Sequence, residues 1–353
     1  MTRWRRTIGI PRMRTAPGGV DRFPESAFGH GSNAAFERPL AASRKSARPQ
    51  SAVILILALL FFAVPAMANT IGVLLSGQGG GYGEVLEALQ TDLRRSPTLR
   101  IHSAVAAIGG QPPDEFNSAQ LVVAVGARAA QIALRNAERV PVLCILIPRA
   151  TFEALTAGMR ATELRRVSAV FLDQPFNRQI ELIRQIIPGA NRVGVVVGTE
   201  SSRDTDRLQQ MLEVRGMRLT SERITRETEL FPALQRVMTD ADVFVALPDP
   251  RVLNSDTAQN VLLTSYRLRT PVVGYSAAYV RAGALAAIYS TPAQVGTQAA
   301  ELVRGYFRTT TLPAAQSPKY FSVSINRQVA RSLSIDVDEE SLVRERIGRA
   351  EGE

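Results

Sequence analysis

Few side chains in this sequence could take part in covalent catalysis. It contains two histidines and one cysteine; His102 lies in a strand-like segment, and Cys144 lies inside an apolar run. A nucleophile activated by histidine, or a His/Cys metal site, needs several such groups in one place. Carboxylates remain open, but close pairs such as Asp240 and Asp242 fall where helix caps and turns are expected. The sequence therefore predicts a protein that is not an enzyme, with no cofactor and no metal.

A glycine-rich segment, residues 76–83, lies between the first expected strand and the first expected helix. A dinucleotide-binding loop would continue Gly77-x-Gly79 with a third glycine, but that position is Tyr82. What remains is a backbone that a ligand can approach closely, next to a helix N-terminus that favours anionic groups. A flexible turn without a ligand is the alternative.

Polar and small residues follow several of the expected strands, where small molecules bind in doubly wound sheets. Arg149 could pair with a carboxylate and Asp249 with an ammonium group, which would suit a small zwitterion or a polar aromatic compound. For any one of these positions, a surface loop or a helix cap is the alternative. The candidate ligand-binding positions are Ser76, Gly77, Gly126, Ala127, Arg149, Thr199, Asp249, Tyr275, Ser276 and Tyr289.

Short apolar segments alternate with amphipathic ones from Thr70 onward, which predicts α/β units built on parallel sheets. Expected strands of the first unit are 70–75, 99–104, 121–125, 142–147 and 168–172, with helices 84–95, 127–137 and 150–157. The alternation begins again after Asp173, with helices 176–187, 204–214, 230–239 and 257–267 and strands 192–197, 217–222, 242–247 and 271–275.

The last apolar block, strand 284–289, helix 292–307 and strand 320–325, is too small for a domain of its own. We expect it to complete the first sheet or to bridge the two. The expected organisation is 69–173 plus 283–335 as lobe 1, 174–282 as lobe 2, and 336–353 as a loose, charged tail. The fold class is thus α/β, with two units built on doubly wound parallel sheets.

Residues 44–68 have the features of a cleavable signal peptide. Basic residues precede an apolar run from Ala52 to Val64, and Ala66-Met67-Ala68 forms a cleavage site. An uncleaved anchor is the alternative, although the run is short for a membrane span of ~20 residues. Residues 1–43 are either a disordered preface or the result of a mis-set translation start. We expect a periplasmic protein.

Charge argues against a nucleic-acid partner. The formal net charge is +10, but residues 1–68 alone hold ten basic and three acidic residues. The rest of the chain has a nearly balanced charge with no basic block, so no nucleic-acid site is expected.

Three stretches resemble the ABC-transporter substrate-binding protein family of the type I periplasmic binding fold, which includes tryptophan and tyrosine binders. They are LLSGQGGGYGEVLEAL, VAVGARAAQIAL and the long segment from ALPDPRVLNSDTAQN through VGTQAAEL with its tail VSINRQVARSL. The resemblance covers residues 70–337 and implies two doubly wound parallel-sheet lobes that enclose one small ligand. It also implies that crossing segments join the lobes, and we expect these near 173–176 and 281–284. It adds Tyr82 to the binding candidates and supports Ser76, Gly126, Ala127, Asp249, Tyr275 and Ser276. The stretch PVLCILIPRATFEAL departs from the amino-acid binders, so Arg149 indicates a different ligand.

These observations predict an exported solute-binding protein that closes on a small polar ligand, an amino acid or a polar aromatic compound, and delivers it to an ABC permease. The alternative is a periplasmic sensor that engages a sensor kinase or a receptor. An exported enzyme is disfavoured by the scarcity of histidine and cysteine. A transcription factor would need a DNA-binding segment where the signal peptide stands.

Overall fold

The computed structural model describes residues 69–96, 98–107, 110–111, 113–199, 202–249 and 255–352. The expected preface 1–43 and signal peptide 44–68 lie outside this part of the chain. No helix among the described residues is long and apolar enough to cross a membrane.

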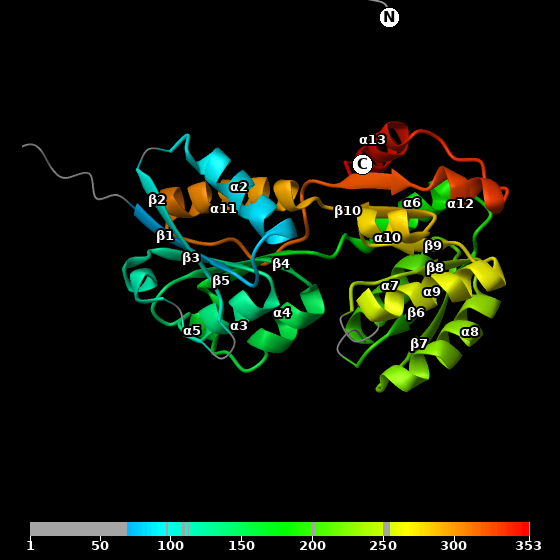
Figure 1. Cartoon of the computed structure of the whole chain (residues 1–353), viewed down its shortest axis with the longest axis horizontal. Coiled ribbons are helices and arrows are strands. Elements are labelled where there is room, and N and C mark those ends of the chain that lie inside the picture. The colour runs from blue at the N-terminus through cyan, green and yellow to red at the C-terminus, as the bar shows by residue number, and fades with distance from the viewer. Residues whose placement is uncertain are drawn as a thin grey trace, which may run out of the picture. The chain divides into compact units, whose positions relative to one another are not determined.

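The first sheet has five strands in the order β2-β1-β3-β4-β5, and all neighbours run parallel. The strands are β1 (Asn69–Leu75), β2 (Leu99–Val105), β3 (Leu121–Val125), β4 (Val142–Ile147) and β5 (Val167–Phe171), and the helices are α2 (Gly80–Leu93), η1 (Asp114–Ser118), α3 (Ala127–Leu134), α4 (Arg149–Thr156) and α5 (Ala161–Leu164). Successive side chains of a strand point to opposite faces. Ile71 and Val73 of β1 therefore pack with α2, while Leu74 packs in a separate core with α3 and α4, so both faces are covered (Figure 1).

The second sheet has six strands in the order β11-β10-β9-β8-β6-β7, of which only the β10/β11 pair is antiparallel. Its strands are β6 (Arg192–Val197), β7 (Arg218–Arg223), β8 (Val243–Val245), β9 (Val272–Gly274), β10 (Ala286–Tyr289) and β11 (Ser322–Ile325), and its helices are α6 (Phe176–Ile186), α7 (Ser202–Glu213), η2 (Glu227–Glu229), α8 (Leu230–Asp240), α9 (Ser255–Leu268) and α10 (Ala277–Ala282). Helices α6 and α7 pack in one core, and α8, α9 and α10 in another. The predicted α/β class with two parallel-strand sheets is confirmed.

The last apolar block divides between the two sheets. Strands β10 and β11 pair in the second sheet, whereas α11 (Pro292–Thr309) packs against α2 of the first. The helices approach closely at Gly296, where an added Cβ would come within 2.7 Å of the Val85 carbonyl oxygen. The expectation that both strands of residues 283–335 join lobe 1 is therefore wrong, because the buried face of β10 completes the core of the second sheet.

The chain consequently passes between the sheets three times: after β5, after β10 and before β11. The first passage agrees with the segment expected near 173–176. The one expected near 281–284 is instead a turn within the second sheet, where Gly283 (φ 128°) ends α10 and its N–H donates to the Val280 carbonyl oxygen. The actual second passage follows Tyr289.

The segment 336–353, expected to be a loose tail, forms helix α13 (Glu340–Ala350) after the short helix α12 (Arg327–Ser332). Its two buried residues, Val343 and Ile347, are 1% and 0% exposed and pack into the core beneath α6. Their spacing places them on one face of the helix, which is enough to dock a helix that is otherwise charged.

Candidate functional site

The strand-end candidates of the first sheet form one cluster. The Ser76 N–H donates to the Val125 carbonyl oxygen (2.9 Å), and the buried Ser76 Oγ accepts from the N–H of Ala129 in the first turn of α3 (2.9 Å). Gly126 has φ 89°, and a Cβ there would lie 2.6 Å from the Ser76 Oγ. Ser76 and Gly126, with Ala127 next in the chain, thus tie the ends of β1 and β3 to the start of α3.

Tyr82, in the first turn of α2, closes over the same cluster. A Cβ added at Gly77 would lie 3.1 Å from the Tyr82 ring, and a Cβ added at Gly126 would lie 2.9 Å from it. Five candidates, Ser76, Gly77, Tyr82, Gly126 and Ala127, therefore gather at the carboxyl end of the first sheet. The absence of side chains on both glycines is what allows the tyrosine ring to lie there.

Arg149 begins α4 directly after β4. Its backbone N–H donates to the Asp173 Oδ2 (2.6 Å), and its guanidinium donates to the Ser317 Oγ (3.3 Å). The guanidinium carbon lies 4.1 Å from the centre of the Phe171 ring, at the end of the neighbouring strand β5. A cation over an aromatic face is stabilised electrostatically, so Ser317 and Phe171 both hold the side chain in place.

Arg149 also lines a cavity of about 230 Å³. Its lining comes from the end of β4, the first passage between the sheets, α6, α7, the end of β8 and the segment before β11. The lining residues are Arg149, Asp173, Gln174, Pro175, Phe176, Gln179, Arg207, Leu247, Pro248 and Ser317. Close by, Arg207 of α7 and Glu153 of α4 approach to 3.8 Å. The cavity thus combines charged, amide, hydroxyl and apolar groups from both sheets.

The candidates on the second sheet lie outside this lining. Asp249 is 4% exposed, and its Oδ2 accepts from the Gly198 N–H (2.8 Å), which ties the end of β6 to the segment after β8. Ser276 caps α10 by accepting from the Tyr279 N–H (3.2 Å). Tyr275 packs against Tyr279 with ring centres 5.3 Å apart and ring planes tilted by 45°, and burial raises the pKa of both phenols.

Two further candidates belong to the edges of this sheet. Thr199 follows β6 and is exposed. The Tyr289 hydroxyl at the end of β10 hydrogen-bonds to the Ser324 Oγ of β11 (2.9 Å). Among the predicted candidates, all of which lie in the described residues, Arg149 alone is in the lining of this cavity.

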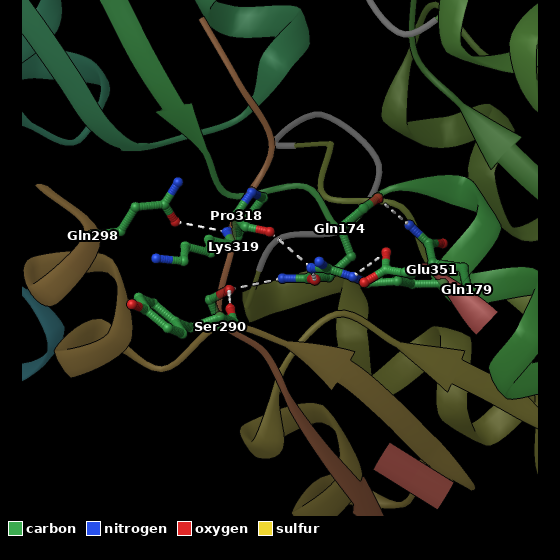
Figure 2. A network of polar contacts seen from close by, with 9 residues as sticks. Gln174, Gln179, Ser290, Gln298, Pro318, Lys319 and Glu351 are labelled. Atoms are coloured by element: carbon green, nitrogen blue, oxygen red, sulfur yellow. Dashed lines mark hydrogen bonds and ion pairs between the residues drawn. The ribbon is translucent and has the colours of Figure 1, made fainter. Parts of the chain in front are cut away.

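A buried polar network joins the three passages between the sheets (Figure 2). Gln174 from the first passage donates to the Ser290 Oγ in the second (2.9 Å). Arg178 of α6 donates to the Gln174 Oε1 (2.9 Å) and to the Pro318 carbonyl oxygen in the third (2.8 Å). It also forms an ion pair with Glu351 at the end of α13 (2.6 Å). Because the donors and acceptors of this network are matched, it fixes the relative course of the three segments.

Nearby, Glu301 of α11 accepts from the hydroxyl of Tyr320 and from Lys319 Nζ. Burial raises the pKa of Glu301, but these hydrogen bonds and the positive charges of Lys319 and Arg304 outweigh it and leave the pKa below its ordinary value. This carboxylate links α11 to the third passage.

The other nine lining residues were not predicted from the sequence; the polar ones are Asp173, Gln174, Gln179, Arg207 and Ser317. The sequence does give a reason to consider Asp173 and Gln179. They lie beside the point where the alternation of strands and helices begins again. Arg207 is an exposed helical residue and Ser317 lies in a long connection, and neither pattern marks a site. Cys144 lies fully buried in β4, and burial raises the pKa of its thiol to about 12, so it is protonated at neutral pH and poorly reactive.

Known structures share this fold. A conserved domain protein from Vibrio cholerae is 19% identical over 78% of this chain and 98% of that chain, with a TM-score of 0.57. An ABC domain in complex with L-Trp from Streptococcus pneumonia is 18% identical over 78% of this chain and 97% of that chain, with a TM-score of 0.58. A ligand-free, open substrate binding protein with adhesive properties from Clostridium difficile is 17% identical over 77% of this chain and 96% of that chain, with a TM-score of 0.61. At these identities the likeness shows the fold alone.

Family membership comes from the sequence itself. No curated protein matches the chain. The model of the family described as ABC transporter substrate binding protein matches residues 114–346. This match spans more than half of the chain and includes strands β3 to β5 of the first sheet, the whole second sheet and the three passages between the sheets. The chain therefore belongs to the ABC transporter substrate binding protein family.

Proposed function

We propose that this protein is exported, binds one small polar ligand by closing around it, and delivers the ligand to the permease of an ABC transporter. Family membership supports a role beside such a transporter. The observation that carries the proposal is the cavity, whose lining combines residues of both sheets with the first and third passages between them.

The physical basis of this function is differential binding. A ligand that contacts residues of both sheets gains its full set of interactions in only one arrangement of the sheets, and it therefore shifts the population toward that arrangement. The three passages could absorb the required dihedral changes as hinges.

Export rests on the segment 44–68, and β1 begins at Asn69, directly after the expected cleavage site. We expect the protein recovered from the periplasm of a Gram-negative host to begin at Asn69. N-terminal sequencing tests this. A product that remains in the membrane with residues 44–68 intact would support an uncleaved anchor instead.

The ligand and the partner need separate tests. Native mass spectrometry of the gently purified periplasmic protein should detect one bound small molecule, and the same molecule added back to stripped protein should raise the melting temperature. A pulldown from membranes should recover an ABC permease. Recovery of a sensor kinase or a receptor would favour the sensing role, and turnover of the bound compound would argue for an enzyme.

A further inference from the structure

The Arg149 guanidinium has no acidic partner within the described part of the chain. Asp173, the carboxylate nearest in the lining, accepts instead from the Arg149 backbone N–H at 2.6 Å. The guanidinium has five N–H donors, and it donates to the neutral Ser317 hydroxyl at 3.3 Å. A partly buried cation in this position has capacity to bind an anion.

The side chain is also held in place before any ligand arrives. Stacking on Phe171, with 4.1 Å between the guanidinium carbon and the ring centre, and the bond to Ser317 limit its rotation. A planar guanidinium held in this way suits a carboxylate, which it can bind through two parallel hydrogen bonds. Preorganisation of this kind lowers the entropic cost of binding.

The rest of the lining limits what the anion can be attached to. Phe176, Leu247 and Pro248 supply apolar surface. The amide of Gln179 donates to the Gln174 carbonyl oxygen (3.0 Å), so one of its two N–H donors is already used. The volume of about 230 Å³ is below that of drug-sized sites, which hold ~300 to 1,000 Å³.

We propose that the cavity binds a small organic carboxylate, with Arg149 and the Ser317 hydroxyl on the carboxylate group and Phe176, Leu247 and Pro248 against the carbon skeleton. This inference rests on the proposed function, since it names the ligand class of the same site. The second guanidinium of the lining, Arg207, lies 3.8 Å from the Glu153 carboxylate, so the ligand's anionic group is assigned to Arg149.

The test uses matched pairs of probes that differ in charge but hardly in shape: benzoate and benzamide, phenylacetate and phenylacetamide, hexanoate and hexanamide, and tryptophan and tryptophanamide. Neutral sugars and polyols complete the set. Melting temperatures of the mature protein identify binders, and calorimetry measures their affinities. At least one acid should bind at least tenfold more tightly than its amide.

Variants then connect the preference to the proposed residues. Arg149→Gln should weaken binding of the acid about ten- to a hundredfold, as loss of a hydrogen bond to a charged group does. Ser317→Ala keeps the cation and should weaken it less. Arg236→Gln is the matched control, because Arg236 pairs with Glu222 and is not in the lining, so its affinity should equal that of the wild type.

The outcomes separate this inference from the proposed function. Binding of a neutral compound in preference to every acid, or acid binding that Arg149→Gln leaves unchanged, overturns the carboxylate site and leaves a solute-binding protein. Failure of every compound to bind counts against both. If Arg149→Gln does not fold, the acid and amide affinities of the wild type and of Ser317→Ala decide.

Discussion

Replacing Arg178 by Met removes the centre of the network that joins the passages between the sheets. The Arg178 side chain is 7% exposed. It makes three charge-assisted contacts: to Glu351 (2.6 Å), to the Gln174 Oε1 (2.9 Å) and to the Pro318 carbonyl oxygen (2.8 Å). Methionine is unbranched and keeps the apolar stem of the side chain, but it removes the cation over the Phe321 ring, whose centre lies 4.4 Å from the guanidinium carbon.

The size of the effect follows from what is left behind. Breaking a buried ion pair by removing one partner costs about 3 to 5 kcal/mol, because the other charge stays buried without compensation. The Glu351 side chain is 22% exposed, so water relieves part of this cost. The carbonyl groups of Gln174 and Pro318 also lose their donor, at about 1 to 3 kcal/mol for each unsatisfied group. These terms are not additive, and we expect a loss of about 3 kcal/mol in the free energy of unfolding.

Urea unfolding followed by circular dichroism measures this loss through the shift in midpoint. The double variant Arg178→Met/Glu351→Met should lose about 1 to 2 kcal/mol less than the sum of the two single variants, because it leaves no orphaned charge. Arg346→Met is the control: its pair with Asp338 is also 2.6 Å long, but the side chains are 46% and 50% exposed, so the loss should be under about 1 kcal/mol. If Arg178→Met cost no more than Arg346→Met, the network would not hold the passages together.

Three further predictions concern helix α13, the cluster around Gly126 at the end of the first sheet, and the dependence of stability on acidic pH. Ile347→Ala, at a position that is 0% exposed, should lower the free energy of unfolding in urea by about 2 to 4 kcal/mol. Leu342→Ala on the same helix, 38% exposed, should change this free energy by less than about 0.5 kcal/mol. Equal effects of the two substitutions would mean that the helix is not docked. Gly126→Ala should cost at least about 1 to 3 kcal/mol in thermal unfolding, because φ 89° and ψ 169° suit glycine alone, while Gly83→Ala, with open space at its Cβ, should be neutral or slightly stabilising. Glu301 has a lowered pKa in the folded protein, so its contribution to the free energy of unfolding is complete above its unfolded pKa and is lost as the pH falls through its folded pKa. The difference in free energy of unfolding between wild type and Glu301→Gln should therefore narrow as the pH falls below about 4.5. A difference that stays constant with pH would contradict the lowered pKa.

Much of the fold could be predicted because apolar periodicity reports local structure. The expected strand 192–197 coincides with β6, and the expected strand 142–147 coincides with β4. The start of α2 was expected at Glu84 but lies at Gly80, because glycines lower helix propensity without preventing helix where packing favours it. Sheet membership is decided by long-range packing, and an apolar strand such as β10 carries no local mark of which sheet it joins.

The candidate site could be predicted in part for the same reason. Arg149 was found because it follows a strand, and the rule for strand ends applies to every parallel strand. Ser317 is separated from Arg149 by 168 residues, and their contact depends on the third passage between the sheets. Arg178 lies on the buried face of α6, where helical periodicity predicts an apolar residue. Its partners, in two passages and the C-terminal helix, become visible only once the chain is folded.

The central claim is that a small ligand closes this protein around itself. Small-angle X-ray scattering of stripped protein, titrated with the molecule that is recovered by native mass spectrometry, tests it most directly. Closure predicts a radius of gyration that falls with ligand and saturates at one molecule per chain. Saturable binding with an unchanged radius of gyration would contradict it.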